Sequence, residues 1–190
     1  MKNYISFLND YYSEYEKNIN PDWLFDSLEQ AKNKILEVQK LDGKLIFFGN
    51  GASSSISSHA ALDFTKQAKV KSSTFHDPSY ITAISNDLGY ENWIKETLKI
   101  YGNQEDLVFF ISVSGESPNI LLGADFAKEN NIDFITFTGK KPNNSLKKKG
   151  NINFWVDSEA YNIVEGIHMI WITTLVDMII GKSVYRVDGK

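Results

Sequence analysis

Four stretches of the chain are continuously apolar instead of alternating between apolar and polar residues. They are KLIFF from Lys44, DLVFFISVS from Asp106, IDFITFT from Ile132 and INFWV from Ile152. Runs of this kind are typical of strands that are covered on both faces, as in a parallel sheet. Helical segments lie around Ala60, Ile94, Ala124 and Ile170. The alternation of strands and helices predicts right-handed βαβ crossovers and an α/β fold with a doubly wound sheet.

The first forty residues carry apolar side chains at helical spacing in two runs. The first run is Tyr4, Ile5, Leu8 and Tyr11, and the second is Trp23, Leu24, Leu28, Ile35 and Val38. Asn20-Pro21 lies between the two runs, and this dipeptide favours a turn. We therefore expect an N-terminal helical hairpin over 1–41 and an α/β core over 42–190, with the last helix at about 160–180.

The composition fits a single soluble domain over 1–190. The chain has 190 residues, of which 42% are hydrophobic and 23% are charged. Its net charge of −4 argues against a general binder of nucleic acid or of anionic membranes. The chain has no cysteine, which excludes disulfides and thiolate catalysis and fits a reducing cytoplasm. We expect a cytoplasmic protein without nucleic-acid partners.

Two segments bear on membrane targeting. The start, MKNYISFLNDYYSEYEK, is polar and acidic where a signal peptide needs an apolar core. The apolar run IVEGIHMIWITTLVDMII carries Glu165, His168 and Asp177. A membrane span rarely holds three ionisable groups, so this run predicts a helix that is buried in the core or in a subunit interface.

Two of the predicted strands end in similar glycine- and serine-rich turns, FFGNGASSS and FISVSGESPN. In an open parallel sheet, ligands bind beyond the carboxyl ends of the strands, where helices begin with unpaired N–H groups. Serine hydroxyls add hydrogen-bond donors there, and Gly49, Gly51 and Gly115 let the backbone approach a ligand closely. The two turns together predict a phosphate cradle.

Other interpretations of these turns are weaker. Neither turn is followed by the Gly-Lys-Ser/Thr of a Walker A loop, and GNGASS lacks the third glycine of the dinucleotide fingerprint. We therefore expect no nucleotide cofactor. Any one of the serines could be only a helix N-cap, but two serine turns at successive strand ends favour phosphate. The basic stretch KKPNNSLKKKG, 140–150, predicts a solvated loop with a short helix.

Three motifs together carry a resemblance to a known family. GNGASSS…SSHAALDF, ISVSGES and AISNDLGYE resemble the sugar isomerase (SIS) fold and, more narrowly, the sedoheptulose-7-phosphate isomerase group, also called phosphoheptose isomerase. The resemblance covers most of the chain. It implies a three-layer sandwich with a mostly parallel five-stranded sheet, and homotetramers with active sites at subunit interfaces.

The resemblance also implies roles for individual residues. It assigns the substrate phosphate to the two serine turns, through Asn50, Gly51, Ser53, Ser112, Ser114 and Ser117. Asn86 and Asp87 would face the sugar hydroxyls. Val113 stands where the family usually has a threonine, which removes one hydroxyl and keeps the backbone N–H.

Interconversion of a ketose and an aldose needs a base beside the carbons and a group that moves protons between oxygens. His59 and Asp63 lie four residues apart on one predicted helix, and Glu165 and His168 lie three apart on another, so each pair shares a helix face. Two carboxylates and two imidazoles could assemble a divalent metal site. The candidate catalytic residues are Asp63, His59, Glu165 and His168, and the candidate zinc ligands are His59, Asp63 and Glu165.

The chain departs from the family at this chemical centre. The family's glutamate base falls at Asp63, its last-helix glutamine at Glu165, and its second catalytic histidine at Thr173. A threonine cannot titrate near neutral pH and is not a usual zinc ligand. His168 is the nearest substitute. His76, in TFHDPSY, is expected to belong to a turn.

The expected function is isomerisation of sedoheptulose 7-phosphate to a glycero-manno-heptose 7-phosphate through an enediolate. The product would supply heptose for surface polysaccharide, either capsule or lipopolysaccharide. Two alternatives stay open. The first is an SIS isomerase for a different phosphosugar, and the second is a non-catalytic adaptor that binds a sugar phosphate or the replication initiator DnaA.

Overall fold

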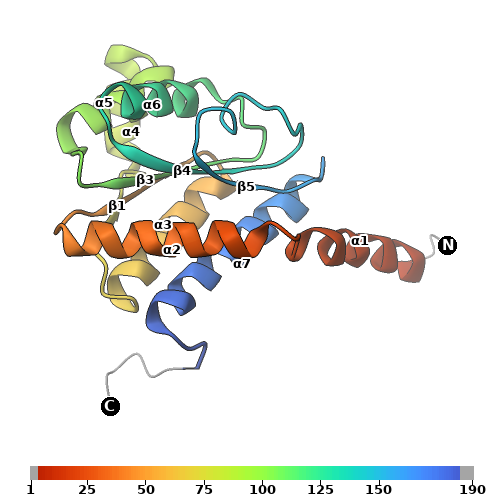
Figure 1. Cartoon of the computed structure of the whole chain (residues 1–190). Coiled ribbons are helices and arrows are strands. Elements are labelled where there is room, and N and C mark those ends of the chain that lie inside the picture. The colour runs from red at the N-terminus through yellow and green to blue at the C-terminus, as the bar shows by residue number, and fades with distance from the viewer. Residues whose placement is uncertain (1–3, 185–190) are drawn as a thin grey trace.

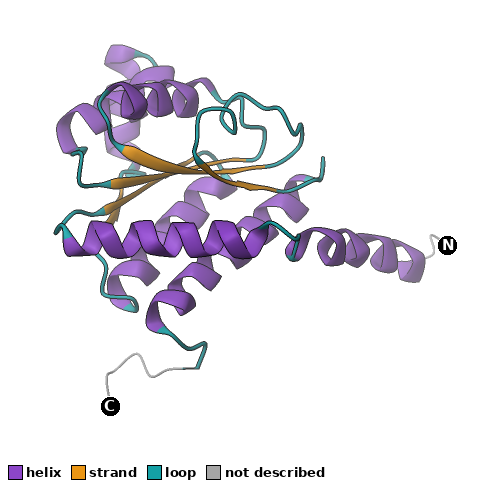
Figure 2. Cartoon of the chain, in the orientation of Figure 1, coloured by secondary structure: helices purple, strands orange, loops and turns teal. Residues whose placement is uncertain are grey.

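The computed structural model describes residues 4–184; residues 1–3 and 185–190, the two ends of the expected domain, lie outside the described residues. A five-stranded parallel sheet has helices on both of its faces (Figure 2). The strands are β1 (Leu45–Gly49), β2 (Ser72–Thr74), β3 (Leu107–Ser112), β4 (Asp133–Thr138) and β5 (Ile152–Trp155). The predicted three-layer α/β sandwich is confirmed.

The order of the strands places a crossover next to the first strand. The sheet runs β2-β1-β3-β4-β5, and β1 pairs in parallel with both β2 and β3. The chain thus moves outward from β1 to the edge at β2 and then returns across β1 to β3. In doubly wound sheets, this reversal opens a crevice at the carboxyl ends of the two inner strands, which is where ligands bind.

The helices divide into two layers. On one face lie α2 (Leu24–Lys40), α3 (Ala52–Lys66) and α7 (Tyr161–Ile180). On the other lie α4 (Pro78–Leu88), the 3₁₀ turn η1 (Tyr90–Asn92), α5 (Trp93–Tyr101) and α6 (Pro118–Glu129), as Figure 1 shows. Both layers are needed because every residue of β1 and of β3 is buried.

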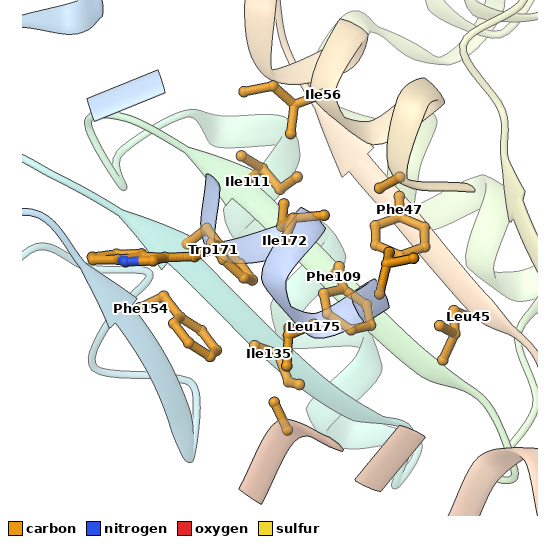
Figure 3. Packing of buried hydrophobic residues seen from close by; sticks show 14 of the residues in the cluster. Leu45, Phe47, Ile56, Phe109, Ile111, Ile135, Phe154, Trp171, Ile172 and Leu175 are labelled. Carbon is orange, nitrogen blue, oxygen red and sulfur yellow. The ribbon is translucent and has the colours of Figure 1, made fainter. Parts of the chain in front are cut away.

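The larger of the two cores is built on a row of phenylalanine rings from neighbouring strands. The ring centroids of Phe47 and Phe109 are 4.5 Å apart, and those of Phe137 and Phe154 are also 4.5 Å apart. Trp171 of α7 packs on Phe154 at 5.9 Å (Figure 3). The alternate residues of the same strands, such as Ile46 and Phe110, face the other core. The continuous apolar runs therefore have the predicted cause.

The edge strand β2 was not predicted from the pattern of apolar residues. Its sequence is Ser-Ser-Thr, its residues are only partly buried, and it pairs with β1 alone. An edge strand of three polar residues leaves no continuous apolar run, so only the family resemblance implied a fifth strand.

The two N-terminal helices are present, but the expected hairpin is wrong. In Figure 1 the chain runs in the same direction through α1 (Tyr4–Ile19) and then α2, so that α1 extends away from the sheet instead of folding back. The carboxyl half of α1 contacts α7 instead. Trp171 Nε1 donates to the carbonyl of Ile19 at 2.8 Å, and Tyr15 Oη donates to the carbonyl of Asn162 at 3.1 Å. These contacts fix the direction of α1.

Helix α7 is a core helix of the α/β sandwich. Within the described residues it alone is long and apolar enough to cross a membrane. Its buried residues include Val164, Ile167, Ile172 and Leu175, and they belong to the core beneath the sheet (Figure 3). Burial against the sheet thus accounts for its hydrophobicity, as the sequence indicated.

Ile135, in the middle of β4, tests the packing of this core. Its side chain is fully buried, whereas that of Ile100 on α5 is 69% exposed. We expect Ile135→Ala to lower the free energy of unfolding by about 2–5 kcal/mol, since it removes buried methylenes and leaves a cavity. Ile100→Ala is the matched control and should change it by less than about 0.5 kcal/mol. Urea unfolding of both variants provides the measurement, and equal losses would contradict the described core.

Candidate functional site

A cavity of about 280 Å³ lies at the carboxyl ends of β1 and β3, beside the first turns of α3, α6 and α7. Its lining comprises Asn50, Gly51, Ala52, Ser53, Ile111, Ser112, Val113, Ser114, Ser117, Tyr161 and Glu165. Every residue that was assigned to the phosphate lies in this set, together with Glu165. We call this cavity the serine cradle.

Two glycines shape the turns of the serine cradle. Gly51 has a φ of +56° and Gly115 a φ of +65°, a region that side chains disfavour. A Cβ on Gly115 would also lie 2.1 Å from Oδ1 of Asn144. Each turn is tight enough that its following helix, α3 or α6, begins at the cavity.

The hydroxyls of the second turn are partly used within the turn. Ser112 Oγ accepts from the N–H of Gly115 at 3.2 Å, and Ser114 Oγ accepts from the N–H of Glu116 at 3.2 Å. Ser117 is the N-cap residue of α6, yet its side chain makes no capping hydrogen bond and lies 3.4 Å from Ser112 Oγ. Its hydroxyl and the first N–H groups of α6 can therefore serve a bound anion.

A side-chain network joins the two turns. Asn50 and Asn119 exchange two amide hydrogen bonds, of 3.0 and 2.9 Å, and the hydroxyl of Tyr90 donates to Asn50 Oδ1 at 2.9 Å. Asn119 is 1% exposed. Asn50 thus holds the first turn against α6, in addition to lining the cavity. Asn119 and Tyr90 were missed as site residues, although both lie in or next to the quoted SNDLGYE and SGESPN motifs.

The serine cradle contains groups that attract an anion and one acidic group that would repel it when ionised. The N-termini of α3, α6 and α7 bring partial positive charge to it. None of its lining residues is a lysine or arginine, and one is an acid, Glu165. Burial raises the pKa of Glu165 above its usual value. A raised pKa extends the pH range over which this carboxyl group holds a proton.

His59 and Asp63 form a pair outside the serine cradle. His59 Nε2 lies 3.1 Å from Asp63 Oδ2, and Gln67 Nε2 donates to Asp63 Oδ1 at 2.6 Å. Asp63 is buried and His59 is exposed. Within residues 4–184 no group of three His, Asp or Glu side chains could hold a metal ion. The expected zinc ligand set His59, Asp63 and Glu165 therefore does not assemble within one chain, because Glu165 lies apart in the cradle.

His168 lies in the hydrophobic core, which contradicts its expected place beside the catalytic groups. Its side chain is fully buried, packs on the rings of Phe137 and Trp171, and its Nε2 lies 3.0 Å from the carbonyl oxygen of Thr138. Burial lowers its pKa to about 4. Positions three apart on a helix differ by about 60° in direction, and here that difference separates the cradle from the core.

Thr173 and the two candidates Asn86 and Asp87 lie away from the cavity lining. The hydroxyl of Thr173 donates within its own helix, to the carbonyls of Met169 and Ile170, both at 3.0 Å. Asn86 and Asp87 are exposed on α4, and Asn86 Nδ2 donates to Asp87 Oδ1 at 2.9 Å. They come shortly before Tyr90 in the chain, and Tyr90, on η1, bonds to Asn50 in the network that joins the two turns.

His76 lies in the loop between β2 and α4, as predicted, and supports the first serine turn. Its Nε2 lies 2.9 Å from the carbonyl oxygen of Gly49, and its Nδ1 contacts the hydroxyl of Thr74. The ring packs on Phe48 and Trp93. Burial lowers the pKa of His76, which favours the neutral ring at this position.

The basic stretch 140–150 is more buried than expected. It consists of turns without the predicted short helix, and Asn144 and Leu146 are buried. The N–H of Leu146 donates to the carbonyl of Gly115 at 3.0 Å, and the N–H of Ser145 donates to Glu116 Oε1 at 2.9 Å. This segment is therefore the outer support of the second serine turn.

Comparison with known proteins agrees with this geometry. The family model described as the SIS domain matches residues 4–139, which is most of the chain. The chain belongs to the SIS-domain family. Within it, the chain falls in the phosphoheptose isomerase group: the phosphoheptose isomerase of Helicobacter pylori (strain P12) is 30% identical over 162 residues, which cover 82% of this chain and 84% of the relative.

Solved structures with this fold include two phosphoheptose isomerases. That from Francisella tularensis has a TM-score of 0.86 at 22% identity and covers 96% of this chain and 100% of its own. That from Neisseria gonorrhoeae has a TM-score of 0.82 at 23% identity, with coverages of 92% and 96%. At these identities the likeness supports the SIS fold.

The burial of His168 predicts acid sensitivity. Between a pKa of about 6.5 when unfolded and about 4 when folded, the unfolded chain binds a proton that the folded chain does not. The free energy of unfolding is therefore highest above pH 6.5. It falls by about 3 kcal/mol in total as the pH is lowered towards 4. In His168→Gln this part of the pH dependence should vanish. Urea unfolding from pH 4 to 7 measures both proteins, and parallel curves would contradict the assignment.

Proposed function

We propose that this protein is an aldose–ketose isomerase that converts sedoheptulose 7-phosphate to a glycero-manno-heptose 7-phosphate through an enediolate. The observation that carries the proposal is the gathering of both serine turns and Glu165 around one cavity at the start of three helices. Membership of the phosphoheptose isomerase group supports the choice of sugar phosphate. The product would feed the synthesis of heptose for surface polysaccharide.

In this proposal the phosphate binds in the serine cradle. Hydroxyls of Ser53, Ser114 and Ser117 and the first N–H groups of α3 and α6 contact its oxygens. The bound phosphate orients the sugar chain along α3, towards the His59–Asp63 pair. Anchoring one end of the substrate fixes the position of the reacting carbons at the other.

The proton transfers are assigned to the two carboxyl groups. Asp63, held by His59 and Gln67, removes the proton from the carbon next to the carbonyl and returns it to the neighbouring carbon. Glu165 lies at the phosphate end of the substrate in this proposal, and its raised pKa makes it the second candidate for proton transfer. A divalent cation would need ligands beyond the His59–Asp63 pair, so assays with and without added zinc belong to the test.

We also propose a homotetramer in the cytoplasm. Helix α1 supports assembly, because its side chains Tyr4, Ile5, Phe7 and Tyr12 are each more than half exposed. Sedimentation at micromolar concentration tests the tetramer.

A second candidate function is a sugar-phosphate-binding protein without turnover. The observation that favours it is the hydroxyl of Thr173, which stands where the family has its second catalytic histidine and is bonded within its own helix. Such a protein would keep the serine cradle and lose proton exchange. An isomerase that acts on a different phosphosugar would keep both the cradle and proton exchange.

Ser114 tests the serine cradle. We expect Ser114→Ala to weaken binding of sedoheptulose 7-phosphate by about 1–3 kcal/mol, the scale of a lost hydrogen bond to a charged group. Ser58→Ala is the matched control, because Ser58 is exposed on α3 and its hydroxyl donates to the carbonyl of Ser54. Isothermal titration calorimetry measures both variants. Equal affinities in Ser114→Ala and the parent protein would show that the phosphate does not bind in this cavity.

Asp63 tests the chemistry. Asp63→Asn keeps the shape and removes the base, so incorporation of solvent deuterium at the substrate carbon should fall by about 10²–10⁴-fold while substrate affinity persists. Asp42→Asn, at a side chain that is 86% exposed, is the control and should keep the parent rate. NMR follows the exchange. If exchange survives in Asp63→Asn and disappears in Glu165→Gln, then Glu165 is the base; no exchange in the parent with any heptose or hexose phosphate favours the binding protein.

A further inference from the structure

The serine cradle has an unusual charge balance for a site that is proposed to take a dianion. Its lining contains no cationic side chain and includes the carboxyl group of Glu165. When Glu165 is ionised, it repels a phosphate in the same cavity. Helix N-termini offset part of this repulsion, but each contributes only about half a positive charge. A full positive charge at the edge of the cavity would complete the balance.

Lys140 is the cation whose backbone is tied to the serine cradle. It follows β4, and the N–H of the preceding Gly139 donates to the carbonyl of Val113 at 2.9 Å. The N–H of Lys140 donates to the carbonyl of Ser158 at 3.0 Å, and its own carbonyl accepts from Trp155 Nε1 at 3.2 Å. Its backbone position is thus fixed from both sides.

The backbone of Lys140 is also strained. Its φ of +53° lies in the left-handed region, which costs a lysine about 1–2 kcal/mol relative to the right-handed one. Strained residues persist where the surrounding structure holds them, and they cluster at functional sites. The side chain of Lys140 reaches α7, where its Nζ lies over the ring of Tyr161.

The side chain of Lys140 is held on an aromatic ring that lines the serine cradle. Its Nζ lies 4.1 Å from the ring centroid of Tyr161, the first residue of α7. Tyr161 lies one helical turn before Glu165 and lines the same cavity. The ring face attracts the ammonium group and holds it beside the cavity.

We propose that Lys140, positioned by Tyr161, is a substrate-binding residue that pairs with the phosphate of the bound sugar phosphate and offsets the charge of Glu165. This assignment rests on the proposed function, because it assumes that the phosphate occupies the serine cradle. Lys140 acts on binding, and the proton transfers stay with Asp63 and Glu165. Binding should therefore weaken more steeply with salt in the parent than in a variant without this charge.

The chain supplies a matched control for this lysine. Lys147 is also half-buried, comes from the same 140–150 segment, and has its Nζ 4.2 Å from the ring centroid of Trp155, outside the cavity lining. Lys140→Met and Lys147→Met therefore remove the same charge and the same type of ring contact. They differ in whether the ring borders the serine cradle.

The experiment measures the affinity of the parent and the variants for sedoheptulose 7-phosphate and for inorganic phosphate by calorimetry. We expect Lys140→Met to weaken both ligands by about 10-fold or more and to lower the salt dependence, and Lys140→Arg to restore most of the affinity. Tyr161→Leu should weaken binding by a smaller factor, since it keeps the charge but frees the side chain. Lys147→Met should stay within about twofold of the parent, because the ring on which Lys147 rests lies outside the cavity lining.

The outcomes separate this inference from the proposed function. If Lys140→Met binds both ligands as tightly as the parent while Ser114→Ala does not, Lys140 has no part in binding and the serine cradle stands. Equal losses in Lys140→Met and Lys147→Met would also overturn it, because they would reflect net charge alone. If Ser114→Ala and Lys140→Met both bind like the parent, the phosphate lies elsewhere and both proposals fail.

Discussion

Burial of both faces of β1 and β3 is the constraint on which the rest of this structure depends. Every residue of these two strands is buried, so helices must cover each face. Because the strands are parallel, each connection crosses the sheet and the next helix begins at the carboxyl edge. The first N–H groups of α3, α6 and α7 are gathered there for this reason alone. The location of the serine cradle is thus a consequence of how the hydrophobic core is covered.

The lining of the serine cradle offers a ligand mainly backbone and hydroxyl groups. Two glycines with positive φ let the turns bend, and the exchanged amide bonds of Asn50 and Asn119 hold the turns together. A buried amide pair is stable only when both partners are satisfied, so it fixes one relative position of the turns. Against this rigid frame Glu165 carries a cost, because burial disfavours its charge. A site residue that is unfavourable for stability is typical of function.

Helix α7 serves the core and the site at once. Its buried side chains, with Trp171 and His168 among them, pack under the sheet, while Tyr161 and Glu165 line the serine cradle. The hydroxyl of Thr173 is satisfied by a hydrogen bond within its own helix. His168 stays neutral, because a charged imidazole would lose its hydration in the core.

The sequence by itself determined the class of the fold and predicted that the two serine turns meet at one edge of the sheet, where they line one cavity. Continuous apolar runs require cover on both faces, and a glycine-serine turn after such a run has few other uses, so both are local signals. Tertiary structure alone decided the rest. The path of α1 depends on contacts of Tyr15 and Trp171 across the chain, β2 exists because its backbone pairs with β1, and Lys140 meets Tyr161 from another element. The helical period places Glu165 and His168 on similar faces, and only packing against the sheet separates them, because their directions differ by less than the width of a helix face.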